Sequence, residues 1–209
     1  MSYALNEVEA TAKRAARGAG YDWGLAEEAA KATRWLCAQG LDGAAVLAGL
    51  LEAGYAADLP AHVPQGLDGD WLAKVRLCPL ASGAALSDCA AQLQHGPLKM
   101  GPVAQPVLIL AFAALAARQL GVCVTVEGEG FQAVTDAAGL QIEGALPESA
   151  AVLTVRAGGS LAAGGPLRTR AEPAEAAWAV LNRFAHKTYA PATEQSRLLG
   201  AGAGLSDND

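Results

Sequence analysis

The stretch PVLILAFAALAA, from Pro106 to Ala117, is the longest apolar segment of the chain. It has 12 residues, fewer than the roughly 20 that a helix needs to span a bilayer. Pro106 suits the first turn of a helix, and Gly121 suits its end. The segment therefore predicts a buried helix, around which the rest of the chain is to be arranged.

Three short-linked helices are predicted before it, in residues 1–55. Asn6 and Glu9 have the spacing of a capping box, in which each side chain binds a backbone N–H at the helix start. Asp22 and Asp42 are placed to cap the second and third helices. Each helix is followed by a glycine that can end it: Gly18 or Gly20 for the first, Gly40 for the second and Gly54 for the third.

Residues 70–190 have a mixed pattern. WLAKVRLCP (71–79) predicts a short strand, and ASGAALSDCAAQLQHG (81–96) a loop followed by a helix with Leu86, Cys89, Ala90 and Leu93 facing inward. From 122 to 159, short β-rich runs with close turns predict an antiparallel meander. A last helix is expected over about 173–187.

These segments together predict an α+β fold. N-terminal helices and the buried apolar helix pack on a small antiparallel β-meander, followed by a C-terminal helix and a glycine-rich tail. We expect one compact domain over residues 1–209, with a helical part (1–55), an α+β core (70–190) and the tail (190–209).

Composition limits the function classes. Apolar residues make up 52% of the 209 residues and the net charge is −6, which argues against disorder and against nucleic-acid or membrane partners. The four cysteines form no C-x-x-C pair, so a structural zinc site is not expected, and no particular cofactor is indicated. The N-terminus lacks a signal-peptide pattern, so we expect a cytoplasmic protein with buried, inert cysteines.

The segment RGAGYDWGLAEEAAKATRW (17–35) holds the first group of candidate site residues. Glu27, Lys31 and Arg34 lie on one helical face and predict a solvated stripe of ion pairs. Glu28 lies beside Trp35 at the edge of the apolar face, where a partly desolvated carboxylate could act as a general acid or base, or could complement the helix N-terminus.

Gly18, Gly20 and Gly24 in the same segment do not form a dinucleotide-binding loop, because a helix rather than a strand precedes them. They are interpreted as a helix end and a tight corner. Trp23 is expected to pack at this corner or to line a ligand pocket.

A second group lies in residues 78–102, where Ser82, His95 and Lys99 occur near a predicted helix. Ser82 lacks the frame of a nucleophile elbow but is a candidate pocket residue. His95 either complements a helix C-terminus or serves as a catalytic group, and Lys99 either binds an anion or extends to solvent.

The tail ends in Asp207-Asn208-Asp209, whose oxygens could bind a hard cation. A frayed acidic terminus is the other interpretation of the same residues.

Three stretches, LNEVEATAKRAARGAGYDWGLAEEAAKATRWL, CPLASGAALSDC and PATEQSRLLGAGAGLSDND, resemble a bacterial family of unknown function found in alphaproteobacteria. The resemblance spans nearly the whole chain and implies no reaction. Leu5 to Gly43 is also similar in layout to the helical start of the malate/lactate/sulfolactate dehydrogenase-like family. Where that family has Ser-His-Gly, this chain has GLDGAAV (40–46), and no histidine follows until His62.

Two function classes follow. The first is a small-molecule enzyme or ligand-binding subunit for a carboxylate or amide-like metabolite, with Glu28, His95 and Lys99 as polar groups and Trp23, Trp35 and Ser82 lining the pocket. The second is a non-catalytic accessory or structural subunit, whose Ala- and Gly-rich helices and long tail form the contacts of an oligomer. A homo-oligomer is expected in either case.

Overall fold

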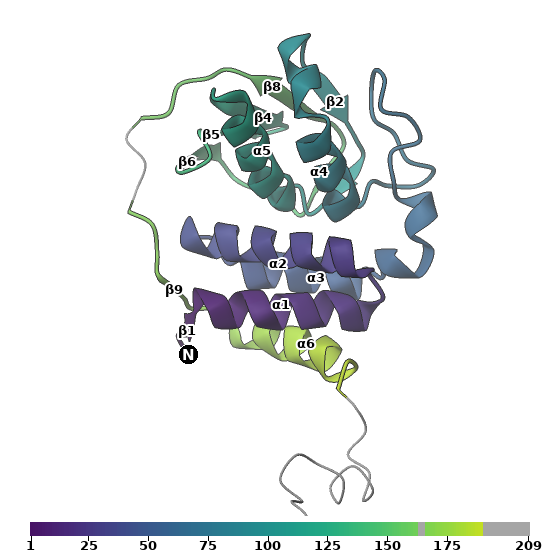
Figure 1. The fold of residues 1–209 in the computed structure, drawn as a ribbon, viewed down its shortest axis with the longest axis vertical. Coiled ribbons are helices and arrows are strands. Elements are labelled where there is room, and N and C mark those ends of the chain that lie inside the picture. Colours follow the sequence, from purple (N-terminus) through teal and green to yellow (C-terminus); the bar gives the residue numbers. More distant parts are fainter. Residues whose placement is uncertain (163–165, 190–209) are drawn as a thin grey trace, which may run out of the picture.

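The apolar segment forms helix α5, Val107–Leu120, which lies in the interior of the computed structural model (Figure 1). The structure describes residues 1–162 and 166–189. Leu108, Ile109 and Phe112 are almost fully buried, and Gly121 ends the helix with a φ of 66°. Both the buried helix and its end were predicted from the sequence.

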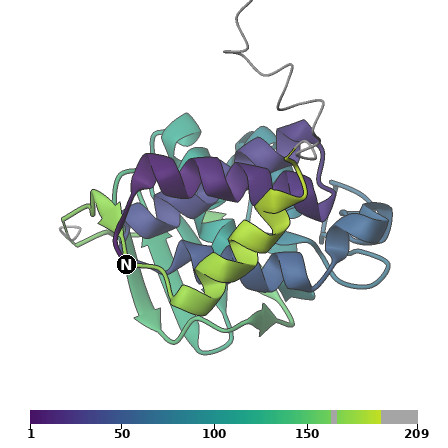
Figure 2. The same ribbon diagram turned by 90° about the horizontal axis from the view of Figure 1, so that it is seen from below.

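Four helices form the lower part of the molecule in Figure 1: α1 (Leu5–Ala19), α2 (Trp23–Ala38), α3 (Gly43–Glu52) and α6 (Glu175–His186). Helices α2 and α3 lie next to α5, while α1 and α6 cross on the side turned away from the sheet (Figure 2). The crossing is close at Gly18, where any Cβ atom would overlap the carbonyl group of Phe184.

The caps of these helices are confirmed in two cases and wrong in one. Asp22 accepts the Leu25 N–H at 2.7 Å, and Asp42 accepts the Ala45 N–H at 2.9 Å.

The predicted Asn6–Glu9 capping box is wrong. Strand β1, Tyr3–Ala4, pairs with β9, Arg170–Ala171, so the chain stays extended through Ala4 and α1 begins at Leu5. It is Glu7 that accepts the Ala4 N–H, at 2.7 Å.

A five-stranded antiparallel sheet covers the other side of α5. Its order is β2 (Leu98–Met100), β8 (Leu153–Ala157), β4 (Val124–Gly128), β5 (Phe131–Thr135) and β6 (Leu140–Gly144). The meander β4–β5–β6 confirms the sequence prediction. Strand β2 was not predicted, because its three residues carry too little pattern to be recognised without their partner β8.

Inward-facing residues of the sheet join one hydrophobic cluster with the helices, and this cluster includes Val126, Ala133 and Val155. Helix α4, Pro79–Asp88, packs beside α5 and is followed by the 3-10 turn η2, Ala90–Gln94. A second 3-10 segment, η1, spans Tyr55–Ala61, and β3 (Val103–Ala104) pairs with β7 (Ser149–Ala150). The fold is α+β, as predicted.

The strand predicted for WLAKVRLCP is not formed. Trp71 bridges Met100 and Leu77 bridges Val103, but Leu72 and Val75 between them are exposed. The segment therefore touches the edge of the sheet only near its two ends.

None of the helices within the described residues has the length and apolar character needed to cross a membrane.

The contact of α4 with α5 gives a stability test at Gly83, where a Cβ atom would overlap the Phe112 ring. Helix propensity alone predicts that Gly83→Ala stabilises the protein by about 1 kcal/mol. Because Phe112 is 1% exposed and a Cβ atom at Gly83 would overlap its ring, we expect a net loss of about 1 kcal/mol or more in the free energy of unfolding, measured by urea denaturation.

The matched control is Gly66→Ala, because nothing lies within 4 Å of a Cβ atom at Gly66. Its unfolding free energy is expected to change by less than about 0.5 kcal/mol. Equal effects of the two substitutions would contradict the proposed packing constraint.

Candidate functional site

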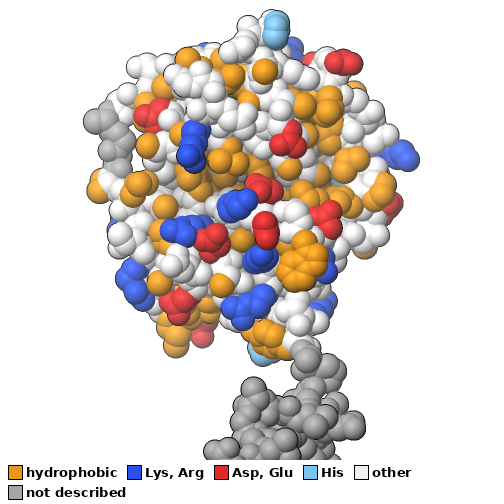
Figure 3. Space-filling model, in the orientation of Figure 1, with side chains coloured by type: hydrophobic (Ala, Val, Ile, Leu, Met, Phe, Trp, Pro, Cys, Tyr) orange, Lys and Arg blue, Asp and Glu red, His pale blue; other side chains and the backbone are white. Residues whose placement is uncertain are grey.

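The main candidate site is a cavity of about 390 Å³ between α2 and α5, which we call the α2–α5 groove. Its floor is apolar and consists largely of small residues, among them Ala32, Ala111 and Ala114, with Phe112 and Leu115 beside them. Alanines on facing helices leave a hollow where longer side chains would have filled the space between the backbones. Figure 3 shows apolar surface interleaved with charged side chains on this face of the molecule.

Trp35 lines the groove. Its indole N–H donates to the carbonyl of Ala137 at 3.3 Å, in the turn between β5 and β6. Asp136 holds this turn by accepting the N–H groups of Ala138 and Gly139 at 3.1 and 2.8 Å. The side chain of Trp35 is therefore fixed by a sheet turn that is distant in sequence.

Glu28 also lines the groove, where its carboxylate pairs with Lys31 at 2.8 Å. This hydrogen bond raises the pKa of Lys31 and keeps its ammonium charged. The side chain of Glu28 is 27% exposed, so it is an ion-paired group at the groove wall rather than a lone buried carboxylate.

In the predicted stripe of Glu27, Lys31 and Arg34, only Lys31 pairs within α2, with Glu28, because α1 packs alongside and supplies the partners of the other two. Glu27 binds Lys13 at 2.6 Å, and this bond lowers the pKa of Glu27. Arg34 binds Glu9 at 2.6 Å.

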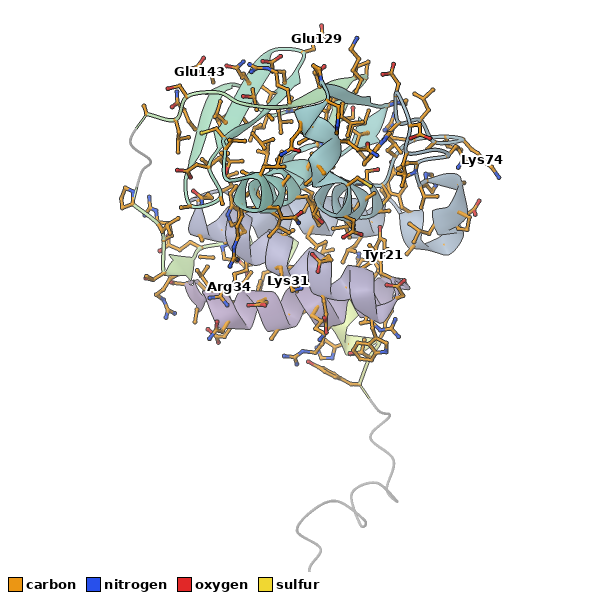
Figure 4. All side chains as sticks on the ribbon, turned by 45° about the horizontal axis from the view of Figure 1, so that its top comes forward. Tyr21, Lys31, Arg34, Lys74, Glu129 and Glu143 are labelled. Atoms are coloured by element: carbon orange, nitrogen blue, oxygen red, sulfur yellow. The ribbon has the colours of Figure 1, made fainter. Side chains whose placement is uncertain are left out.

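Arg34 also donates to Asn6 at 2.9 Å. The two residues expected to cap α1, Asn6 and Glu9, thus hold an arginine at the rim of the groove. In Figure 4, Lys31 and Arg34 lie one beside the other on the helical layer.

Arg118, in the last turn of α5, is the remaining cation of the groove. It is exposed, and it has no hydrogen-bond or ion-pair partner within residues 1–162 and 166–189. The sequence analysis treated Arg118 only as the boundary of the apolar stretch. The signal that could have identified it is its spacing from Ala111 and Leu115, which places all three residues on one helical face.

His95 and Lys99 lie outside the α2–α5 groove. His95 follows η2 and lines a separate, shallow hollow with Asp68 and Asp70. Lys99 is exposed on β2, whose neighbouring residues face the core. The structure therefore does not bring either residue together with Glu28.

Trp23 is the first residue of α2 and is 64% exposed. It lies over α1, with the guanidinium of Arg17 at 4.5 Å from its ring centroid, and lines a different hollow from Trp35. The two tryptophans expected to form one wall are at separate sites.

Ser82 is fully buried in α4, and its hydroxyl has no hydrogen-bond partner within the described residues. One turn earlier, the Cys78 thiol lies 3.4 Å from the Tyr21 hydroxyl, and both are buried. Burial raises the pKa of both groups, so both remain neutral at ordinary pH. None of the three lines the groove.

Within the described residues, no group of three or more His, Cys, Asp or Glu side chains is arranged to hold a metal ion. The cation site suggested for Asp207-Asn208-Asp209 lies outside the described residues.

The raised thiol pKa values of Cys37 and Cys78, both due chiefly to burial, predict low reactivity. At pH 8.5, where a free thiol is about half ionised, iodoacetamide should label the partly exposed Cys89 and Cys123 and spare Cys37 and Cys78, as mapped by peptide mass spectrometry. In urea all four should react. Fast labelling of Cys78 in the folded protein would contradict its placement.

The match with a known family covers residues 3–94, and the family is described as protein of unknown function (DUF3726). The matched part runs from β1 to the end of η2, so it contains Glu28, Arg34 and Trp35 but not α5. The comparison with curated proteins found no match. Nothing found supports the similarity to the dehydrogenase-like family, whereas the resemblance to an uncharacterised family is confirmed: over residues 3–94 this chain is similar to the family of unknown function DUF3726.

Proposed function

We propose that this chain binds a small amphipathic carboxylate in the α2–α5 groove. The observation that carries the proposal is Arg118, a guanidinium that has no partner among the described residues and lies beside an apolar floor formed by Phe112 and Leu115. A guanidinium binds a carboxylate through two parallel hydrogen bonds, while the floor accepts an apolar body.

The charges around the groove favour an anion. Its lining has two carboxylates, Glu9 and Glu28, and three cations, Lys31, Arg34 and Arg118. The carboxylates are already paired with Arg34 and Lys31, so the surplus charge is positive and is located on Arg118.

The neighbouring surface sets the orientation of the ligand. A second hollow continues from Arg118 along α2 and α4 and is lined by the acidic residues Asp22, Glu27 and Asp88. Arg118 lines both hollows, and the acidic groups of the second one disfavour an anion there. The carboxylate therefore contacts Arg118 from the side of the groove, and the apolar body lies within the groove, toward Trp35.

The proposal is for binding rather than for a reaction. Glu28, which the sequence suggested as a general acid or base, is ion-paired with Lys31, and His95 and Lys99 line no part of the groove. This arrangement supports a ligand-binding role, in which Glu28 orients Lys31 at the rim.

The test measures binding of 2-naphthoate, an aromatic carboxylate, by isothermal titration calorimetry. Arg118→Gln removes the cation and keeps polarity, so the affinity should fall by about 10- to 100-fold, corresponding to a charged hydrogen bond of about 1.5–3 kcal/mol. The matched control is Lys74→Gln, which removes an exposed cation on the loop before α4 (Figure 4). This variant should bind 2-naphthoate with the affinity of the native protein.

2-Naphthalenemethanol, which keeps the ring system and lacks the carboxylate, should bind the native protein as weakly as 2-naphthoate binds the Arg118→Gln variant. Equal affinities of native protein and variant for 2-naphthoate would refute the proposal.

A second candidate function, the accessory subunit, is favoured by one observation. The loop between η1 and α4 exposes three large apolar side chains, Leu67, Leu72 and Val75, at 42%, 57% and 66%. Several such residues in one loop are typical of a contact surface between subunits.

If this loop forms the contact of a homo-oligomer, light scattering coupled to size exclusion should give a mass above that of the 21.2 kDa chain. The double variant Leu72→Ser, Val75→Ser should then run as a monomer, while Val122→Ser, which changes another exposed residue, should not. A native protein that is monomeric at all concentrations would exclude this candidate.

A further inference from the structure

Another hollow, of about 650 Å³ and separate from those beside Arg118, lies where the end of α1, the start of α2 and the end of α6 meet. Among residues 1–162 and 166–189, its lining includes no acidic side chain and four cations: Lys13, Arg14, Arg17 and Lys187. We call it the basic hollow. A concentration of positive charge at one place is unexpected in a chain whose net charge is −6. In Figure 3, Lys and Arg side chains are numerous over the lower part of the molecule.

Most of the charge in the basic hollow is uncompensated. Lys13 pairs with Glu27 at 2.6 Å. Arg17 donates to the backbone carbonyl of Tyr21, and Arg14 donates to the hydroxyl of Tyr189 at 3.1 Å, so both bind neutral groups. The Lys187 ammonium has no hydrogen-bond or ion-pair partner within the described part of the chain and lies 4.6 Å from the centroid of the Phe184 ring.

Trp23 adds an aromatic surface to this hollow. Its position follows from the tight turn at Gly20 and the Asp22 cap, which start α2 at Trp23 and leave the indole over α1. Arg17 and Lys13 lie 4.5 and 5.7 Å from the ring centroid, yet 64% of the residue is exposed. The indole is therefore held in place by cations and remains open for stacking.

We propose that the basic hollow binds a ligand that joins a phosphate to an aromatic ring, as in a nucleoside diphosphate. The ring stacks on Trp23, and the phosphates contact Arg14, Arg17 and Lys187. Guanidinium groups bind phosphate oxygens through paired hydrogen bonds, and an indole stacks on any base. The volume is within the range of small-molecule sites. This site is independent of the α2–α5 groove.

A purely structural role of these cations makes a different prediction. Arg17 and Lys187 lie at the C-terminal ends of α1 and α6, where positive charge stabilises a helix. Such a role requires neither a phosphate nor an open indole. The two explanations are therefore separated by ligand binding, not by stability.

The test titrates the full chain with ADP, adenosine and inorganic phosphate in isothermal titration calorimetry. We expect saturable binding of one ADP per chain, with adenosine and phosphate each at least about tenfold weaker, because each lacks one of the two contacts. The affinity for ADP should decrease as salt is added.

Lys187→Gln removes an exposed, unpaired cation and should weaken ADP binding at least about threefold, and Trp23→Leu should weaken it about tenfold. The matched control is Arg183→Gln, on the same helix, whose guanidinium binds Glu52 at 2.8 Å outside the hollow; it should bind ADP as the native protein does. Circular dichroism and thermal unfolding verify that each variant is folded.

Absence of saturable ADP binding overturns the proposal and leaves the cations with their helix-end role. If inorganic phosphate binds as tightly as ADP, or if Trp23→Leu binds ADP as the native protein does, the stacking contact is refuted. If Lys187→Gln and Arg183→Gln lose the same affinity for ADP, the proposed site is refuted. Arg118→Gln should leave ADP binding intact, so the failure of this proposal and of the groove proposal are distinguishable.

Discussion

Burial of α5 is the constraint on which the other elements depend. A helix that is apolar on every face up to its last turn needs cover around most of its surface. Here the sheet covers one side, α4 a second, and α2 and α3 the third. The contact with α4 is close because Gly83 leaves room for the ring of Phe112. A helix with one polar face would have needed fewer layers, and the N-terminal helices would then have had no second surface to pack on.

The same packing creates the candidate site. Helices α2 and α5 meet through alanines, and the hollow left between them is bounded by charged residues of three elements. Ion pairs between α1 and α2 neutralise Glu9, Glu27 and Arg34, while Arg118 on α5 has no ion-pair partner among the described residues. An apolar floor with one surplus cation is thus a consequence of which helices are neighbours.

Local signals predicted the elements whose cause is local. The caps at Asp22 and Asp42 and the limits of α5 each depend on a few adjacent residues, and all were predicted. Predictions that depended on distant partners were wrong. The Asn6–Glu9 box was displaced by the pairing of β1 with β9, and the pairing of Glu27 with Lys31 by the approach of α1. Strand β2 was missed, because it is a strand only through its pairing with β8.

The sequence by itself determined the fold class, the buried helix, the meander, and the positions of Glu28 and Trp35 at the edge of the inner face of α2. These features follow from the 3.6-residue period of a helix and the two-residue period of a strand, and each period depends only on residues of one element. The tertiary structure alone decided that His95 and Lys99 lie away from Glu28, and that Trp23 and Trp35 belong to different hollows. It also decided that Arg118 has no partner within the described part of the chain. The physical reason is that the distance between side chains on different elements is set by how those elements pack, and packing depends on contacts between residues far apart in the chain.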